Sequence, residues 1–332
     1  MKTIKKLLKW VGATLGFILV LLIIAGLTSR LFTPEPTPPG KLVDIGGFKL
    51  HTVVKGQKND KPTLVIESGA GAPSEYYYWL GELLKDSLRV VRYDRAGMGF
   101  SESSDKPRDP KTIAQELHTL LENSGEQPPY ILAGHSYGGH YIRVFKHLFP
   151  EDVVGMVFLD SPHPDESERL NMPPSPSFLK PLYHLGGITG DLGLLNLYSR
   201  WAKRPLLWAP GLPDKIVEGY RDYAINGDYL WGYIREEKKH KDLVDLSRKI
   251  SEFDTLPIRV FSGTNLNEPL LLKKGIDPNF IREERRKMQL EMASRSKNGE
   301  VHFLEGGHIT IFSLKKNAQF ISDEILKFIN QL

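Results

Sequence analysis

The residue of this sequence best suited to nucleophilic chemistry is a serine between glycines, in the run Gly134-His135-Ser136-Tyr137-Gly138. The G-x-S-x-G pattern alone is a weak signal, with roughly 0.2 chance matches expected in a chain of this length. Its context is more specific, because a strand-like apolar run, 130–133, precedes it and a helical segment, 139–148, follows it. Such a turn would expose Ser136 and direct helix N–H groups toward a developing negative charge. The alternative is an ordinary glycine-rich turn with a solvated serine.

A serine hydroxyl is a poor nucleophile until a base accepts its proton. His308 follows a Gly-Gly pair and lies between the last predicted strand, 301–304, and a closing helix predicted at 317–332. We expect this turn to bring His308 to the edge of the sheet, where it would act as the general base. His302 is a poorer candidate because it lies inside the strand and would point away from the turn. A turn histidine without a catalytic role is the alternative for His308.

The carboxylate that would orient the imidazole is less well defined by the sequence. Asp160 ends the strand predicted at 153–159, and a carboxylate there could hold the correct tautomer of His308 and stabilise its cation. Capping of the turn at Ser161 is the alternative role for Asp160. Glu268, which follows the strand predicted at 258–262, is the second candidate for the acid.

An oxyanion that forms on a substrate carbonyl requires hydrogen-bond donors that are already in place. The backbone N–H of Tyr137, directly after the serine, is one expected donor. The other is expected from the small-residue loop 68–72, where the N–H of Ala70 is favoured because small residues allow close backbone approach. A flexible glycine loop without this role is the alternative.

The composition argues against several other kinds of site. The chain has no cysteine, which excludes disulfides and thiolate metal ligands. His140 and His147 share a predicted helix without a third ligand at suitable spacing, so neither a metal nor a cofactor is expected. The net charge of +4 comes from four lysines within the first nine residues, and nucleic acid is therefore not an expected partner. Charge runs such as 282–286 are typical of solvated helix faces.

An apolar segment near the N-terminus, residues 10–27, contains no charged residue. As a helix its 18 residues would rise about 27 Å, close to the hydrocarbon thickness of a bilayer. Four lysines precede the segment and only Arg30 follows it closely, and this excess of positive charge predicts that the N-terminus is in the cytoplasm and the remaining chain outside. A cleaved signal peptide, followed by secretion, is the alternative, but residues 25–30 offer no good cleavage site. We therefore predict a single-pass membrane anchor within residues 1–32.

The rest of the sequence predicts a mostly parallel sheet with crossover helices, because short strand-like runs alternate with helical patterns. Residues 33–40 are proline-rich and form an expected stalk. The alternation is interrupted at 161–256, which we interpret as a helical cap inserted between two halves of a core, 41–160 and 257–332. Aromatic residues in the cap and in 76–79 could line a pocket for an apolar substrate, although packing explains most of them.

Four ordered motifs resemble those of the α/β-hydrolase superfamily with a cap domain: Ser68-Gly69-Ala70-Gly71, the run 93–101, 134–139, and Gly307-His308. This resemblance implies a structural role for the turn 93–101, and in one branch, the haloalkane dehalogenases, the acid lies at the place of Asp160. That branch and the epoxide hydrolases use an aspartate nucleophile, so Ser136 argues against both activities. The Ser68-Gly69 pair departs from the His-Gly common at this loop.

The resulting hypothesis is a serine hydrolase that cleaves a small-molecule carboxylic ester. An amidase or iminopeptidase is the alternative, and it would need cap carboxylates to bind an α-amine, for which Glu218, Asp222 and Asp228 are weak candidates. A ligand-binding receptor that does not turn over its ligand is an alternative from another class.

Overall fold

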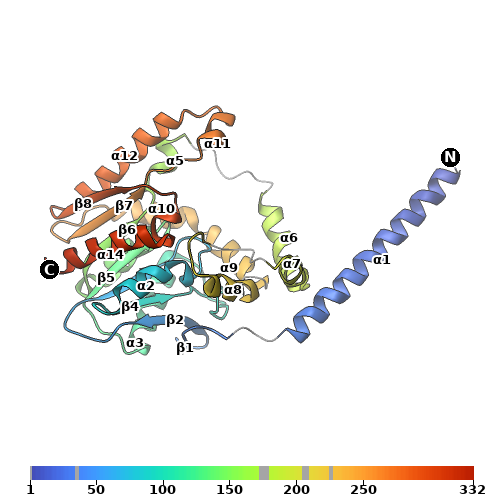
Figure 1. Cartoon of the computed structure of the whole chain (residues 1–332), viewed down its shortest axis with the longest axis horizontal. Helices are drawn as coiled ribbons and strands as arrows, with labels where there is room; N and C mark the ends of the chain where they lie inside the picture. The colour runs from blue at the N-terminus through green and yellow to red at the C-terminus, as the bar shows by residue number, and fades with distance from the viewer. Residues whose placement is uncertain (1, 34–36, 172–178, 204–208, 224–226) are drawn as a thin grey trace.

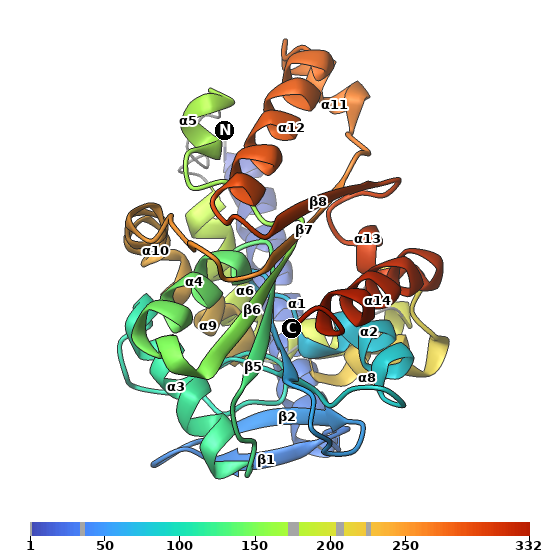
Figure 2. The ribbon, with the colours of Figure 1, turned by 90° about the vertical axis from the view of Figure 1, so that its left-hand side faces the viewer.

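The computed structural model describes residues 2–33, 37–171, 179–203, 209–223 and 227–332. Within these residues eight strands form one sheet in the order β1-β2-β4-β3-β5-β6-β7-β8 (Figure 2). The strands β1 and β2 form an antiparallel hairpin, β2 pairs antiparallel with β4, and the remaining neighbours are parallel. Their bounds are β1 Lys41–Asp44, β2 Lys49–Lys55, β3 Thr63–Glu67, β4 Val90–Tyr93, β5 Tyr130–His135, β6 Val153–Leu159, β7 Ile258–Gly263 and β8 Gly299–Leu304. The predicted mostly parallel sheet is confirmed.

Helices cover both faces of this sheet, as Figure 2 shows. The central strands β3 and β5 are buried along their whole length, which explains their continuous apolar runs. One face is covered by α3 (Pro110–Asn123), α4 (Gly138–Leu148), α10 (His240–Lys249) and α12 (Pro278–Ser294). The other face is covered by α2 (Tyr78–Leu84), α13 (Thr310–Ser313) and α14 (Lys315–Ile329).

The helix α3 shows how local sequence sets a boundary. Asp109 is its N-cap, and its side chain accepts hydrogen bonds from the backbone N–H groups of Lys111 and Thr112. Pro110 occupies the first helical position, where a missing N–H costs nothing. The helix predicted at 111–123 therefore differs from the observed one by a single residue at its start.

Between β6 and β7 the chain forms helices in the segment expected to be a cap. Their bounds are α5 Glu166–Arg169, α6 Leu179–Asp191, α7 Leu194–Ala202, α8 Asp214–Tyr223, α9 Gly227–Glu237 and α10. A short helix, α11 (Glu268–Lys273), follows β7. Figure 1 shows α6 and α7 at the side of the molecule from which the N-terminal helix extends.

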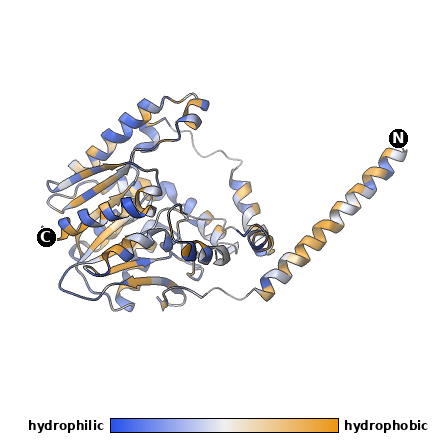
Figure 3. Ribbon diagram, viewed as in Figure 1, coloured by the Kyte–Doolittle hydropathy of each residue, from blue (hydrophilic) through white to orange (hydrophobic). Residues whose placement is uncertain are grey.

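That N-terminal helix, α1 (Lys2–Phe32), is long and apolar enough to cross a membrane. It extends away from the sheet domain, and most of its residues are apolar (Figure 3). Its last turns contact α7, since Ser29 Oγ donates a hydrogen bond to Asn196 Oδ1 at 2.6 Å. The helix runs beyond both ends of the apolar segment 10–27.

Candidate active site

Ser136 lies on a tight turn between the end of β5 and the start of α4, where the sequence predicts it. Its φ is +52°, a left-handed conformation that is uncommon for a residue with a side chain. The turn requires glycine on both sides. A Cβ atom on Gly134 would lie 2.6 Å from the carbonyl group of Gly138, and one on Gly138 would lie 2.3 Å from the carbonyl oxygen of Glu67. The chain therefore exposes Ser136 at the carboxyl edge of the sheet.

The structure brings His308 and Asp160 together across 148 residues of chain. His308 Nδ1 lies 2.7 Å from Asp160 Oδ2, and the backbone N–H of Gly263 donates to Asp160 Oδ1 at 2.8 Å. The ionised carboxylate accepts a hydrogen bond from the Nδ1–H group, so the neutral imidazole carries its proton on Nδ1 and the lone pair of Nε2 can act as a base. Burial raises the pKa of Asp160, but the hydrogen bond from His308 and the charge of Arg285 outweigh it and hold this pKa below its usual value.

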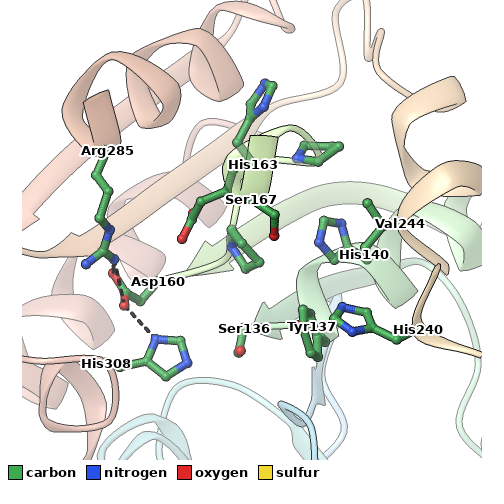
Figure 4. Close-up of a pocket in the computed structure, with 13 residues that line it drawn as sticks. Ser136, Tyr137, His140, Asp160, His163, Ser167, His240, Val244, Arg285 and His308 are labelled. Carbon is green, nitrogen blue, oxygen red and sulfur yellow. Dashed lines mark hydrogen bonds and ion pairs between the residues drawn. The ribbon is translucent and has the colours of Figure 1, made fainter. Parts of the chain in front are cut away.

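Ser136 and His308 both line a cavity of about 200 Å³ (Figure 4). In the part of the chain that the structure describes, no hydrogen bond joins the hydroxyl of Ser136 to the imidazole of His308. Catalytic hydrogen bonds are often long in a free enzyme and tighten when substrate binds. The arrangement thus places a hydroxyl, an imidazole and a carboxylate around one cavity, with the carboxylate contact already made.

Glu268, the second candidate for the acid, does not contact His308. Its carboxylate pairs with Arg282 Nη2 at 2.5 Å on the surface, and both side chains are about half exposed. His302 lies in β8, and its ring stacks on Phe261 at a centroid distance of 5.1 Å. These contacts leave Asp160 as the carboxylate beside the imidazole.

Sequence reasoning missed Arg285. The run 282–286 predicts a solvated helix face, but Arg285 points from α12 into the cavity and Nη2 donates to both oxygens of Asp160, at 3.0 and 3.1 Å (Figure 4). The expectation fails because the rotation of α12 over the sheet, which is set by packing, decides which residues of a charged run face inward. No spacing within the run distinguishes Arg285 from its neighbours.

The two N–H groups expected to bind the oxyanion have no hydrogen-bond partner among the described residues. Among the described residues, neither the backbone N–H of Ala70 nor that of Tyr137 donates to another group. The N–H of Gly69, by contrast, donates to Tyr77 Oη at 3.0 Å and is not available to a substrate. A Cβ atom on Gly69 would lie 3.1 Å from Cβ of Ser136, so the loop and the serine are close enough to serve one oxyanion.

A buried arginine fixes the loop that carries Ala70. Arg95 Nη1 donates to Glu67 Oε1 at 2.6 Å and to the carbonyl of Ser68 at 2.7 Å, and Nη2 donates to the carbonyl of Gly69 at 2.9 Å. The same guanidinium donates to both carboxylate oxygens of Glu236 in α9, at 2.9 Å each. Arg95 therefore connects the loop to α9 as well as to the sheet.

A second chain of hydrogen bonds connects this loop to the loop that carries His308. Tyr77 Oη, which accepts from Gly69, lies 2.8 Å from His135 Nδ1, and His135 Nε2 lies 3.0 Å from the carbonyl oxygen of His308. The carbonyl can only accept, so Nε2 of His135 carries the proton and Tyr77 donates to Nδ1. Burial lowers the pKa of His135 well below its usual value, which keeps the ring neutral.

Mainly polar side chains line the rest of the cavity, and the described cap aromatic residues that could have lined an apolar pocket, within residues 183–233, are absent from this lining. They include Glu166, His163 from the β6–α5 loop, and His140 and His240. Burial lowers the pKa of all three histidines. Among the described residues no group of three histidine, aspartate or glutamate side chains is placed to hold a metal ion.

Residues 64–321 match the model of the Alpha/beta hydrolase family. The chain belongs to this family. It is 30% identical over 167 residues to the uncharacterised protein YbdG of Bacillus subtilis, which covers 48% of the chain and 51% of YbdG. It is 26% identical over 192 residues to the human (lyso)-N-acylphosphatidylethanolamine lipase, which covers 55% of each chain.

The fold of this α/β-hydrolase is also that of solved structures. The structure described as a “putative lipase” from Acinetobacter baumannii AYE superposes with a TM-score of 0.60 at 18% identity, over 88% of this chain and 92% of that one. The chain spans about half or less of the length of the curated relatives it matches first. A lipase and a methylesterase are among its curated relatives.

Proposed function

We propose that this α/β-hydrolase cleaves a carboxylic ester through an acyl-enzyme intermediate. Ser136 Oγ attacks the carbonyl carbon while His308 Nε2 accepts its proton, and the N–H groups of Ala70 and Tyr137 stabilise the oxyanion. His308 then donates this proton to the departing alkoxide. In the second half His308 deprotonates water, which attacks the acyl carbon. His308 then returns this proton to Ser136 Oγ as the bond from Oγ to the acyl carbon breaks and the acid is released.

The observation that carries this proposal is the 2.7 Å contact between His308 Nδ1 and Asp160 Oδ2 at the cavity into which Ser136 points. The contact fixes the imidazole in the tautomer that accepts a proton from a serine. The free N–H groups of Ala70 and Tyr137 support it. Ser136 itself argues against epoxide or haloalkane chemistry, which in this family starts from an aspartate.

Among the residues that the structure describes, no contact favours the amidase alternative. Neither Glu218 nor Asp228 lines the cavity beside Ser136, and the side chain of Asp222 lies outside the described residues.

We further propose that α1 anchors the enzyme in a membrane, with the N-terminus in the cytoplasm and the catalytic domain outside. Besides the Ser29–Asn196 hydrogen bond, Arg30 Nη1 donates to the carbonyl of Asp191 at 2.8 Å, and Arg200 Nη1 donates to Thr33 Oγ1 at 2.7 Å. These contacts support a retained helix, because a cleaved signal peptide would not need specific partners in the cap.

The ester proposal is tested with chromogenic esters of increasing acyl length and the matched anilides, using the detergent-solubilised full chain. Esters should be hydrolysed faster than anilides, and Ser136→Ala should lower the turnover by about 10³-fold or more. Faster hydrolysis of anilides, or full ester turnover in Ser136→Ala, would show that the proposed reaction is wrong.

A further inference from the structure

The cap helix α6 carries an apolar face that no described part of the chain covers. Leu182, Leu185 and Ile188 follow one another at three-residue spacing and are 55%, 55% and 48% exposed. The opposite face of α6 packs on α9, where a Cβ atom on Gly187 would lie 2.6 Å from the ring of Trp231. The apolar residues therefore point away from the domain and face its surroundings.

The helix α7, which packs next to α6, carries further exposed aromatic residues. Tyr198 is 52% exposed and Trp201 is 80% exposed. We call the set Leu182, Leu185, Ile188, Tyr198 and Trp201 the apolar cap face. Tyrosine and tryptophan are enriched where a membrane meets water, since their rings sit at the level of the lipid head groups.

The packing of α1 on the cap places this face at a defined height along the membrane helix. A Cβ atom on Gly26 would lie 2.4 Å from the carbonyl oxygen of Leu192, and one on Gly193 would lie 2.1 Å from the carbonyl oxygen of Gly26. The backbones thus meet closely at the turn between α6 and α7. Gly26 is the next-to-last residue of the apolar segment 10–27, so this turn lies where α1 leaves the hydrocarbon.

The charges beside the apolar cap face suit a phospholipid surface. Lys180, Arg200 and Lys203 are exposed, and the one acidic residue within the sequences of α6 and α7, Asp191, accepts a hydrogen bond from Trp231 Nε1 at 2.9 Å. An excess of basic residues around an apolar helix face is typical of helices that lie in the membrane interface. Association with a second copy of the chain would require neither this position beside the end of the apolar segment of α1 nor this excess of basic residues.

We propose that the apolar cap face lies in the interface of the membrane that α1 spans, and that the enzyme takes an amphiphilic ester from that bilayer. This inference rests on the proposed membrane anchor. The face is also close to the active site, because Tyr183 of α6 contacts Tyr233 at a ring distance of 5.2 Å. Tyr233 lines a small cavity together with Ala70 and Tyr137, the two expected oxyanion donors.

Because the chain has no cysteine, single cysteines give unique labelling sites on the full-length protein. Three exposed leucines make a matched set: Leu185→Cys on the apolar cap face, Leu21→Cys in α1, and Leu290→Cys on α12. Each variant is labelled with a polarity-sensitive fluorophore and placed, one chain per disc, in phosphatidylcholine–phosphatidylglycerol nanodiscs with or without a nitroxide phospholipid. Circular dichroism and thermal unfolding verify that each variant is folded.

We expect nitroxide lipid to lower the fluorescence at positions 21 and 185 by at least about twofold and to leave position 290 unchanged. Quenching at 21 but not at 185 overturns the cap proposal and leaves the anchor in place. Absence of quenching at 21 overturns both. Shielding of 185 only in discs that hold two chains, without lipid quenching, assigns the face to a second copy and also overturns the proposal. None of these readouts uses turnover of Ser136, so failure of the ester proposal is seen separately.

Discussion

Arg285 Nη2 donates to both carboxylate oxygens of Asp160, at 3.0 and 3.1 Å, on the carboxylate that also contacts His308. Asp160 is 2% exposed, so the ion pair lies in a poorly solvated place where a neighbouring charge acts strongly. The arginine helps to keep Asp160 ionised, and it also shares with His308 the negative charge that would stabilise the imidazolium.

Replacement of Arg285 should change the pH dependence of stability. The pKa of Asp160 is below its usual value of 3.8, so its ionisation stabilises the folded state above that pH, and this contribution is lost as pH falls through the lower folded value. Arg285→Met should raise the folded pKa and lower the free energy of unfolding at neutral pH by about 1 to 3 kcal/mol, with a smaller difference in acid. Thermal unfolding in detergent across pH measures this effect.

Arg282→Met is the matched control, since Arg282 lies on the same helix and pairs with the exposed Glu268. It should change stability by less than about 0.5 kcal/mol at any pH. Equal effects of the two substitutions would contradict a specific role of the Arg285–Asp160 pair.

The assignment of the acid is tested by removing one charge at a time. Asp160→Asn should lower kcat about 10³- to 10⁴-fold, because an amide favours the wrong imidazole tautomer. Glu268→Gln should leave kcat within about twofold, since that side chain pairs at the surface. Loss of activity in Glu268→Gln alone would show that Asp160 is not the catalytic acid.

Tyr77 is expected to position the oxyanion loop. Tyr77→Phe leaves the N–H of Gly69 and Nδ1 of His135 without their partner, so both stability and kcat should fall, with kcat about tenfold lower and KM little changed. Tyr130→Phe is the control because its buried hydroxyl donates to the carbonyl of Glu126, at the opposite end of β5. It should lower stability alone. Equal kcat values for the two variants would refute the positioning role.

Close packing at the serine turn leads to a prediction for Gly138. Gly138→Ala would place a methyl group 2.3 Å from the carbonyl oxygen of Glu67, and the resulting shift should lower stability by about 1 to 3 kcal/mol together with activity. Gly219→Ala, in an exposed part of α8 with nothing near its Cβ position, should be neutral or raise stability by up to about 1 kcal/mol. Unfolding and turnover of both variants decide the comparison.

The sheet could be predicted because parallel strands are buried on both faces and therefore appear as apolar runs. For β3 the predicted range, 63–67, equals the observed one, and β5 extends only two residues beyond the predicted 130–133. Ser136 could be assigned to its turn because strand, turn and helix are adjacent in the chain. The helix α2 was not predicted, because Tyr78–Leu84 is short and its aromatic residues also suit a loop.

Contacts between distant segments could not be predicted. The order of the motifs along the chain indicates His308 as the base and Asp160 as the acid. It does not exclude Glu268 as the acid, because a sequence does not tell which carboxylate lies within reach of an imidazole. Arg285 and Tyr77 were missed for the same reason, since the side of a helix that faces the active site depends on how the helix packs. The polar lining of the cavity likewise comes from side chains whose directions only the fold determines.

The central claim, that Ser136 is a nucleophile activated by His308, is tested most directly with a fluorophosphonate probe. Mass spectrometry of the labelled full-length enzyme should locate one covalent adduct on Ser136, absent in Ser136→Ala and formed at least about 10²-fold more slowly in His308→Ala. A folded enzyme without an adduct, or an adduct that persists in Ser136→Ala, would contradict the account.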